Sequence, residues 1–292
     1  MLSSELIAQV RKIEIRTRRA VDEIIGGAYH SVFKGRGIEF DEVREYSDED
    51  DFRDIDWNVT ARMGAPYIKK YVEERELNVM LLVDVSASGA FGSGEKSKRR
   101  YAIETAALLA FSAIRNNDRV GLTMFSDRTE LYLSPRSGRK HGLRLVRDLM
   151  AFEPERRKTN IDLVLQETIK VLNKKTVIFL ISDLIDEHDF QKSLRIINRR
   201  HDVIAVRILD PLELKWPAGV NVTLEDAESG NNLSFNARNR KLVENFSRAA
   251  ENWHDKSKTI CEKARVDMIE MRCGEDIVKP LINFFNKRRK RH

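Results

Sequence analysis

The feature that most constrains the fold is an alternation of short apolar runs with longer runs of helical periodicity, which begins at residue 77. This pattern is typical of a parallel sheet that is covered by helices on both faces, with right-handed crossovers. We therefore predict an α/β fold with a doubly wound, mostly parallel sheet flanked by helices. The predicted strands are 78–83, 119–125, 176–181, 202–208 and 266–271. The predicted helices are 98–114, 161–172, 189–199, 240–263 and 275–286.

Smaller elements are predicted beside this sheet. Residues 129–134 are expected to form a short antiparallel edge strand, and residues 220–236 a hairpin. The helix at 101–114 is apolar on nearly every side, so it should pack against the sheet and be covered by its neighbours.

The chain before the alternation has a different character, and we predict two parts, 1–76 and 77–292. Residues 1–25 are expected to form an amphipathic helix, and residues 26–37 an irregular docked segment. Residues 39–56 hold ten carboxylates against Arg44 and Arg53. So acidic a segment cannot be a buried strand, and we predict a structured surface loop.

Composition limits the classes of partner and the compartment. Cys261 and Cys273 are the two cysteines, and we interpret them as free thiols of a cytoplasmic protein. The apolar stretches fall short of the ~20 residues that a membrane-spanning helix needs. The net charge of +6 is concentrated at the two chain ends, where the final basic run is expected to be a solvated tail, so we expect no nucleic-acid partner. A monomer is expected because no exposed apolar heptad pattern stands out.

Oxygen-bearing side chains follow two of the predicted strands. Asp84, Ser86 and Ser88 stand at alternate positions where the strand 78–83 ends, and Asp183 closely follows the strand 176–181. Ligand sites of parallel sheets lie at the carboxyl edge, where such loops converge, so both carboxylates should share one rim. A set of carboxylates and hydroxyls favours Mg²⁺ or Mn²⁺ over Zn²⁺. Asp84 taken alone could equally be a helix cap or a turn residue.

The Asp-x-Ser-x-Ser run at the end of the first strand resembles the metal-ion-dependent adhesion site of von Willebrand factor A domains. In that family the two serines bind the ion, a threonine from a second loop joins them, and aspartates act directly or through water. The resemblance implies the ligands Asp84, Ser86, Ser88, Thr159 and Asp183. Relatives usually have Gly-Gly-Thr where this chain has Arg157, Lys158 and Thr159, and helix capping is an alternative role for the threonine.

The segment before the sheet contains Gly37, Glu39, Phe40, Arg44, Tyr46, Asp50, Asp51, Arg53, Asp56, Trp57, Ala61 and Arg62. These residues resemble the signature that precedes the A domain in domain-of-unknown-function family fifty-eight. That resemblance implies a partner role with a MoxR-type AAA+ ATPase. An alternative is structural, with Trp57 as a core anchor and Arg44 and Arg53 neutralising nearby carboxylates. Its rival is that the acidic segment docks the ATPase.

Two functions from different classes follow from these residues. The first is a non-enzymatic, metal-dependent protein-binding module, in which an acidic residue of a protein ligand completes the shell of the ion. Such a module would serve as an adaptor of the ATPase in complex assembly, maturation or stress tolerance. The second is a Mg²⁺-dependent hydrolase that uses Asp84 and Asp183. A haloacid-dehalogenase-type phosphatase would need a second acid where Ser86 stands, and the chain has no phosphate-binding glycine loop.

Overall fold

The structure is a computed structural model that describes residue 13 and residues 39–47, 50–72, 76–214, 221–225, 232–236 and 238–291. The chain forms two compact units, of which the smaller is Phe33–Leu77 and the larger contains Asn78–His292. The helix predicted over 1–25 and the irregular segment over 26–37 lie outside the described residues, Ile13 excepted. The division of the sequence at residue 76 stays a prediction.

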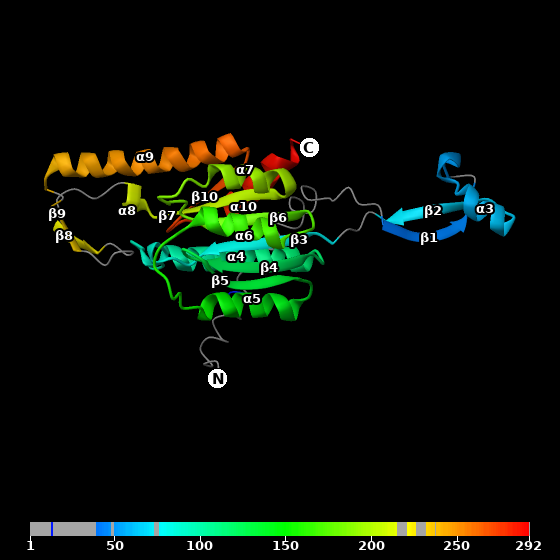
Figure 1. Ribbon diagram of the computed structural model, residues 1–292, viewed down its shortest axis with the longest axis horizontal. Helices are drawn as coiled ribbons and strands as arrows, with labels where there is room; N and C mark the ends of the chain where they lie inside the picture. Colours follow the sequence, from blue (N-terminus) through cyan, green and yellow to red (C-terminus); the bar gives the residue numbers. More distant parts are fainter. Residues whose placement is uncertain are drawn as a thin grey trace. The chain divides into compact units, whose positions relative to one another are not determined.

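A six-stranded sheet forms the centre of the larger unit and confirms the predicted α/β class (Figure 1). Its five neighbouring parallel strands are the five predicted from sequence, and the sixth is the antiparallel edge strand. Four of the parallel strands are nearly continuous apolar runs because they are buried on both faces, whereas the edge strand Asp267–Arg272 is only partly buried. The order across the sheet is β10 (Asp267–Arg272), β7 (Asp202–Leu209), β6 (Thr176–Ser182), β3 (Asn78–Asp84), β4 (Arg119–Phe125) and β5 (Thr129–Arg136).

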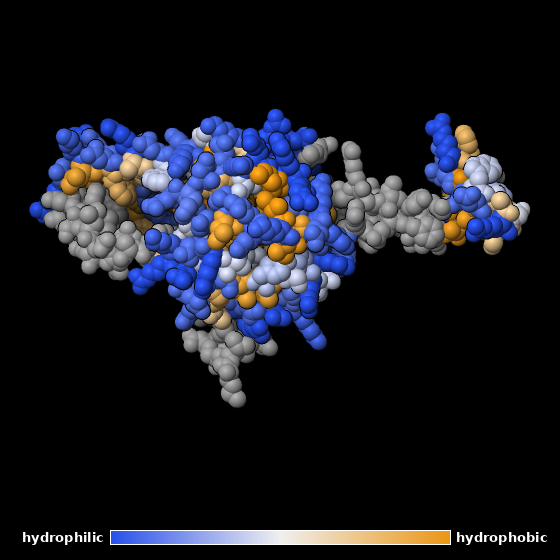
Figure 2. Space-filling model, in the orientation of Figure 1, coloured by the Kyte–Doolittle hydropathy of each residue, from blue (hydrophilic) through white to orange (hydrophobic). Residues whose placement is uncertain are grey.

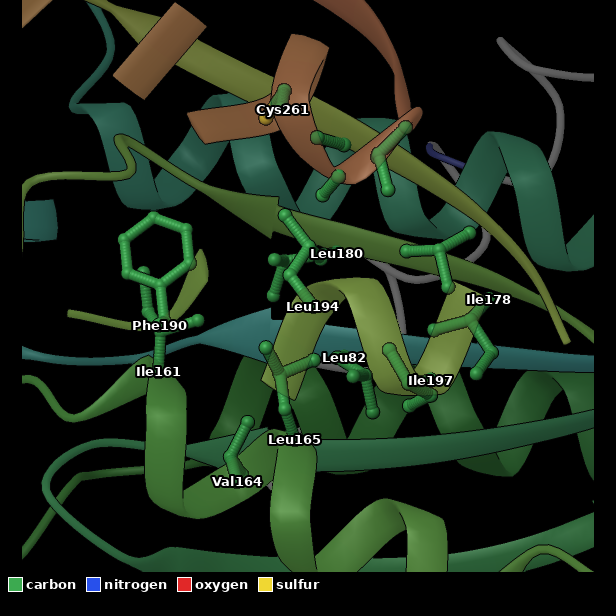
Figure 3. Close-up of a cluster of buried hydrophobic side chains, with 14 of the residues drawn as sticks. Leu82, Ile161, Val164, Leu165, Ile178, Leu180, Phe190, Leu194, Ile197 and Cys261 are labelled. Carbon is green, nitrogen blue, oxygen red and sulfur yellow. The ribbon is translucent and has the colours of Figure 1, made fainter. Parts of the chain in front are cut away.

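Helices cover one face of the sheet through a single apolar cluster (Figure 3). Leu82 of β3 and Leu180 of β6 belong to this cluster, together with side chains of three helices. The cluster excludes water from this face, and at about 25 cal/mol per Å² such burial is the main term that stabilises the sheet. The helices are α6 (Ile161–Val171), α7 (Gln191–Arg200) and α9 (Arg240–Ala264).

The opposite face is covered by α4 (Lys98–Arg115), which contacts β3, β4, β6 and β7. Side chains alternate along a strand, so Leu81 and Val83 of β3 point away from the first cluster, toward this helix. Residues of α4 are buried on nearly every side, as its apolar sequence predicts. Two further helices are α5 (Arg139–Ala151), which packs on α4, and α10 (Val278–Arg289), which packs on β10.

Two predictions for smaller parts of the larger unit have different outcomes, and one helix was not predicted. The hairpin is confirmed as β8 (Asn221–Glu225) paired with β9 (Asn232–Asn236). Helix α5 was missed. The basic run near the chain end is not a free tail, because α10 continues through it to Arg289 and Arg288 donates to Asp202 at 2.6 and 2.7 Å.

The smaller unit corrects the prediction of an acidic surface loop. The first part of that segment is a strand, β1 (Glu39–Glu45), which pairs antiparallel with β2 (Tyr67–Val72) (Figure 1). Solvent reaches both faces of a two-stranded ribbon, so a strand can be acidic here without being buried. After a turn at η1 (Phe52–Asp54), helix α3 (Trp57–Met63) follows, capped by the side chain of Asp56.

Trp57 is 69% exposed, so it is not a core anchor of the smaller unit. Arg44 does neutralise a carboxylate, since its guanidinium donates to both oxygens of Asp50 at 2.5 and 2.9 Å. That ion pair lowers the pKa of Asp50.

The surface of the larger unit is mostly hydrophilic on the face that Figure 2 shows, with separate apolar spots. Among the helices of the described residues, none combines the length and the apolar character needed to cross a membrane.

Candidate functional site

The candidate site lies at the carboxyl edge of the sheet, between β3 and β6. These neighbouring strands run parallel, with Val83 beside Ile181. After β3 the chain goes through α4 to β4 on one side, and after β6 it goes through α7 to β7 on the other side. The connections after β3 and β6 therefore run in opposite directions across the sheet. Open α/β sheets form their ligand crevices at such a point. Asp84 ends β3 and Asp183 directly follows β6, so the structure brings the two carboxylates to one rim.

Asp84 is buried and both of its oxygens accept hydrogen bonds. The backbone N–H of Ser86 donates to Oδ1 at 2.9 Å, and the hydroxyl of Ser182 donates to Oδ2 at 2.7 Å. The first contact is the local turn that an aspartate forms with the residue two positions later, and it shapes the Asp-x-Ser loop. Burial, and then the negative charge of Asp183, raise the pKa of Asp84 from 3.8 to about 6.

Three hydroxyls come from two loops that meet beside Asp84. Ser86 is buried, and its Oγ lies 3.1 Å from that of Ser88 in the short helix η2 (Ala87–Ala90). The N–H of Ala87 donates to the carbonyl of Arg157 at 2.9 Å, which ties this loop to the one that carries Thr159.

The hydroxyl of Thr159 is buried and has no hydrogen-bond partner among the described residues. Thr159 is not the cap of α6, because Asn160 is the residue whose side chain accepts from the N–H of Leu163, at 2.9 Å. The alternative role of Thr159 as a helix cap is thus wrong. A buried hydroxyl without a partner is uncommon, since it loses the hydrogen bonds of water and gains none.

Asp183 is engaged by a buried lysine that sequence reasoning missed. The Nζ of Lys98, at the start of α4, donates to Asp183 Oδ2 at 2.8 Å and to Glu213 Oε1 at 2.5 Å. Glu213 belongs to the short helix α8 (Pro211–Leu214) after β7. Burial lowers the pKa of Lys98, but the charges of Asp183 and Glu213 raise it by more, so its pKa lies above the ordinary value. The other oxygen of Asp183 accepts from the N–H of Ile185 at 3.1 Å.

A second cation from α4 supports the serine loop. Arg99 donates from Nη2 to the carbonyls of Val85 and Ser86 at 3.1 and 3.2 Å. Lysine and arginine at the start of a helix oppose the helix dipole. The run of Lys98, Arg99 and Arg100 at the start of a helix is therefore unusual. It is the feature of the sequence that could have identified Lys98 and Arg99 as site residues.

Of the five predicted ligands, Asp84, Ser88 and Asp183 line a small hollow at the sheet edge, whereas Ser86 and Thr159 are not among its lining residues. Its donors are carboxylates and hydroxyls, which suit Mg²⁺ or Mn²⁺. In the described part of the chain no cluster of three or more histidine, cysteine or acidic side chains could hold a metal, so an ion here would depend on the hydroxyls. The unpartnered hydroxyl of Thr159 fits such a role. The hollow is lined by Asp84, Ser88, Gly89, Lys98, Arg99, Ala102, Ile181, Ser182, Asp183 and Ile208.

Comparison with known proteins finds a family and a fold. The family model "Protein of unknown function DUF58" matches residues 42–256. Uncharacterized proteins of Mycobacterium bovis and Mycobacterium tuberculosis are 29% identical to this chain over 289 residues, which is 98% of the chain and 90% of each relative.

Solved structures resemble the chain at low identity. The conserved hypothetical protein BatB from Bacteroides thetaiotaomicron matches with a TM-score of 0.50 and 15% identity, over 73% of this chain and 99% of BatB. The VWA domain of SpRpn10 matches with a TM-score of 0.42 and 14% identity, over 72% of this chain and 95% of that domain. The match to BatB agrees with the α/β fold described above.

Proposed function

The chain belongs to DUF58, a family of proteins of unknown function, and we propose that it acts as a metal-dependent protein-binding module. The observation that carries the proposal is the buried hydroxyl of Thr159, which has no partner among the described residues. It belongs to a loop tied to the one that carries two further hydroxyls and follows Asp84. A divalent ion would give that oxygen the partner it lacks.

In this proposal Asp84, Ser86, Ser88 and Thr159 hold one Mg²⁺ or Mn²⁺ ion, and Asp183 contributes from the neighbouring strand. Mg²⁺ prefers six oxygen ligands and keeps waters where the protein supplies fewer. When bound, the ion offers a position that a carboxylate of a partner protein can take from water. The partner of this site is therefore a protein that presents an aspartate or a glutamate.

The resemblance to DUF58 proteins suggests which partner this is. A MoxR-type AAA+ ATPase is the proposed partner, and the chain would act as its adaptor in protein-complex assembly, maturation or stress tolerance. The support for this step is the resemblance of the segment before the sheet, together with the family match over residues 42–256.

The metal site is tested by removing the Thr159 hydroxyl alone. In Thr159→Val we expect Mn²⁺ affinity, measured by isothermal titration calorimetry, to fall about tenfold or more, because one ligand of the ion is lost. Without metal, the free energy of unfolding should stay within about 0.5 kcal/mol of wild type or rise, because no hydrogen bond is broken.

The matched control is Thr168→Val, in which the lost hydroxyl donates to the carbonyl of Val164 at 2.7 Å within α6. This variant should lose about 1 kcal/mol of stability and keep its Mn²⁺ affinity. Equal Mn²⁺ affinity in wild type and Thr159→Val would show that the threonine is not a ligand. If wild type takes up no Mn²⁺, the metal-dependent binding function is wrong, and the Mg²⁺-dependent hydrolase that would use the same two aspartates loses its support as well.

A further inference from the structure

Three basic residues begin helix α4, where the helix dipole disfavours positive charge. Arg100 finds a partner within its own helix, since its Nε donates to Glu104 at 3.1 Å. Lys98 instead reaches across the sheet edge to Asp183, and Arg99 reaches the serine loop. Two positively charged side chains therefore lie at the candidate site, although the dipole of the helix that carries them disfavours positive charge at this end.

The ammonium of Lys98 is almost fully enclosed, with 3% of its side chain exposed. A buried ammonium costs much free energy unless carboxylates compensate it. Asp183 and Glu213 do so, at 2.8 and 2.5 Å. Since Asp183 Oδ1 also accepts from the backbone of Ile185, both oxygens of this aspartate already have partners.

Both oxygens of Asp84 also accept hydrogen bonds, so the two halves of the site differ in the kind of partner. The serine hydroxyls lie on the side of Asp84. The loop that carries them is hydrogen-bonded to the loop of Thr159, whose hydroxyl has no partner among the described residues. On the other side, Asp183 is neutralised by a positive charge that the chain itself provides. An ion that uses Asp183 has to approach this ammonium, and two cations a few ångströms apart repel each other strongly where little water screens them.

We propose that Lys98 is a tethered cation that competes with the divalent ion for Asp183 and so sets the affinity of the site for the ion. Glu213 is the second partner that keeps the ammonium compensated when the ion takes Asp183. This inference rests on the proposed function, because it concerns the same ion. It makes Lys98 a residue that weakens ion binding, in contrast to the ligands.

The test is to titrate wild type and Lys98→Met with Mn²⁺. Calorimetry gives the affinity for the ion, and thermal unfolding gives the shift in melting temperature that Mn²⁺ causes. Methionine keeps the apolar stem and removes the charge. We expect Lys98→Met to bind Mn²⁺ at least about tenfold more tightly than wild type, and to gain more thermal stability from the ion. The matched control is Lys96→Met, because the ammonium of Lys96 pairs with Glu104 at 2.8 Å, and its Mn²⁺ affinity should not change.

A double variant, Lys98→Met with Glu213→Gln, keeps the test informative if Lys98→Met alone does not fold. It removes the carboxylate that the single variant leaves without a counter-charge, and it keeps the formal charge of the site equal to that of wild type. We expect it also to bind Mn²⁺ more tightly, because Asp183 is released in both variants.

The outcomes separate this inference from the proposed function. If wild type binds Mn²⁺ and the folded variants bind no more tightly, the competition by Lys98 is wrong and the proposed function stands. Binding by the variants but not by wild type would support the competition and refute a metal-dependent function of the natural chain. If none of the proteins binds Mn²⁺, both ideas are wrong.

Discussion

Asp84 is the residue whose surroundings most directly predict a dependence on pH. Its pKa is raised from 3.8 to about 6 by burial and by the charge of Asp183. Between these values the folded protein holds a proton that the unfolded chain has released. The stability of the metal-free protein therefore falls as pH rises from about 4 to about 6, by an amount on the order of 3 kcal/mol, and does not change further above that window on account of this group.

The variant Asp84→Asn removes this titration. We expect the stability of Asp84→Asn relative to wild type to increase as pH rises from about 4 to about 6 and then to level off. Urea unfolding of both metal-free proteins across this range measures the difference. A difference that stays constant with pH would mean that Asp84 is ionised in the folded protein throughout.

At the residue scale, the sequence predicts site residues that lie close together in the chain. It does not predict site residues that only the fold brings together. Asp84, Ser86 and Ser88 form one local run at a strand end, and Asp183 directly follows a second apolar strand. Lys98 meets Asp183 across 85 residues and Glu213 across 115, and local periodicity does not specify such pairs. Whether the five predicted residues bind an ion stays a prediction.

At the element scale, the end of α10 gives the clearest prediction. Arg288 packs against the start of β7, where its guanidinium donates to both oxygens of Asp202 at 2.6 and 2.7 Å. Both side chains are largely shielded from water, at 13% and 25% exposed, so this ion pair should contribute more than a surface pair.

We expect Arg288→Ala to lower the free energy of unfolding by about 1 to 3 kcal/mol, measured by urea unfolding. Lys287→Ala, one position earlier on the exposed side of the helix, should change it by less than about 0.5 kcal/mol. Equal effects of the two substitutions would show that the last turn of α10 is a solvated tail after all.

The elements predicted correctly are those with one dominant period. The central parallel strands β3 and β6 are continuous apolar runs, and α6 and α9 have clear helical spacing. Helix α5 was missed because Gly142 and five basic residues dilute its apolar stripe. A Cβ at Gly142 would meet the tip of the Ile114 side chain of α4, a contact that the sequence does not reveal. Strand β1 was missed because its acidic composition was interpreted as that of a surface loop. Its pairing with β2, a segment later in the chain, cannot be read from that composition.

At the scale of the whole molecule, charge is divided unequally between the two units. Phe33–Leu77 contains 13 acidic and 8 basic residues, a net charge of −5, whereas the chain as a whole carries +6. The smaller unit also exposes Phe52, Trp57 and Met63, each more than 60% accessible. An acidic unit with exposed apolar groups is the rival to the metal site as the place where a partner docks, and such docking would weaken with added salt.

The most direct test of the central claim is capture of the proposed MoxR-type ATPase in Mg²⁺ or Mn²⁺, compared with EDTA, by wild type and by a folded Asp84→Ala variant. We predict capture by wild type that requires the ion and is lost in Asp84→Ala, because the ion joins this site to a carboxylate of the partner. Capture that ignores both the metal and the substitution would contradict the account and move the interface to the acidic unit. No capture under any of these conditions would contradict the adaptor role itself.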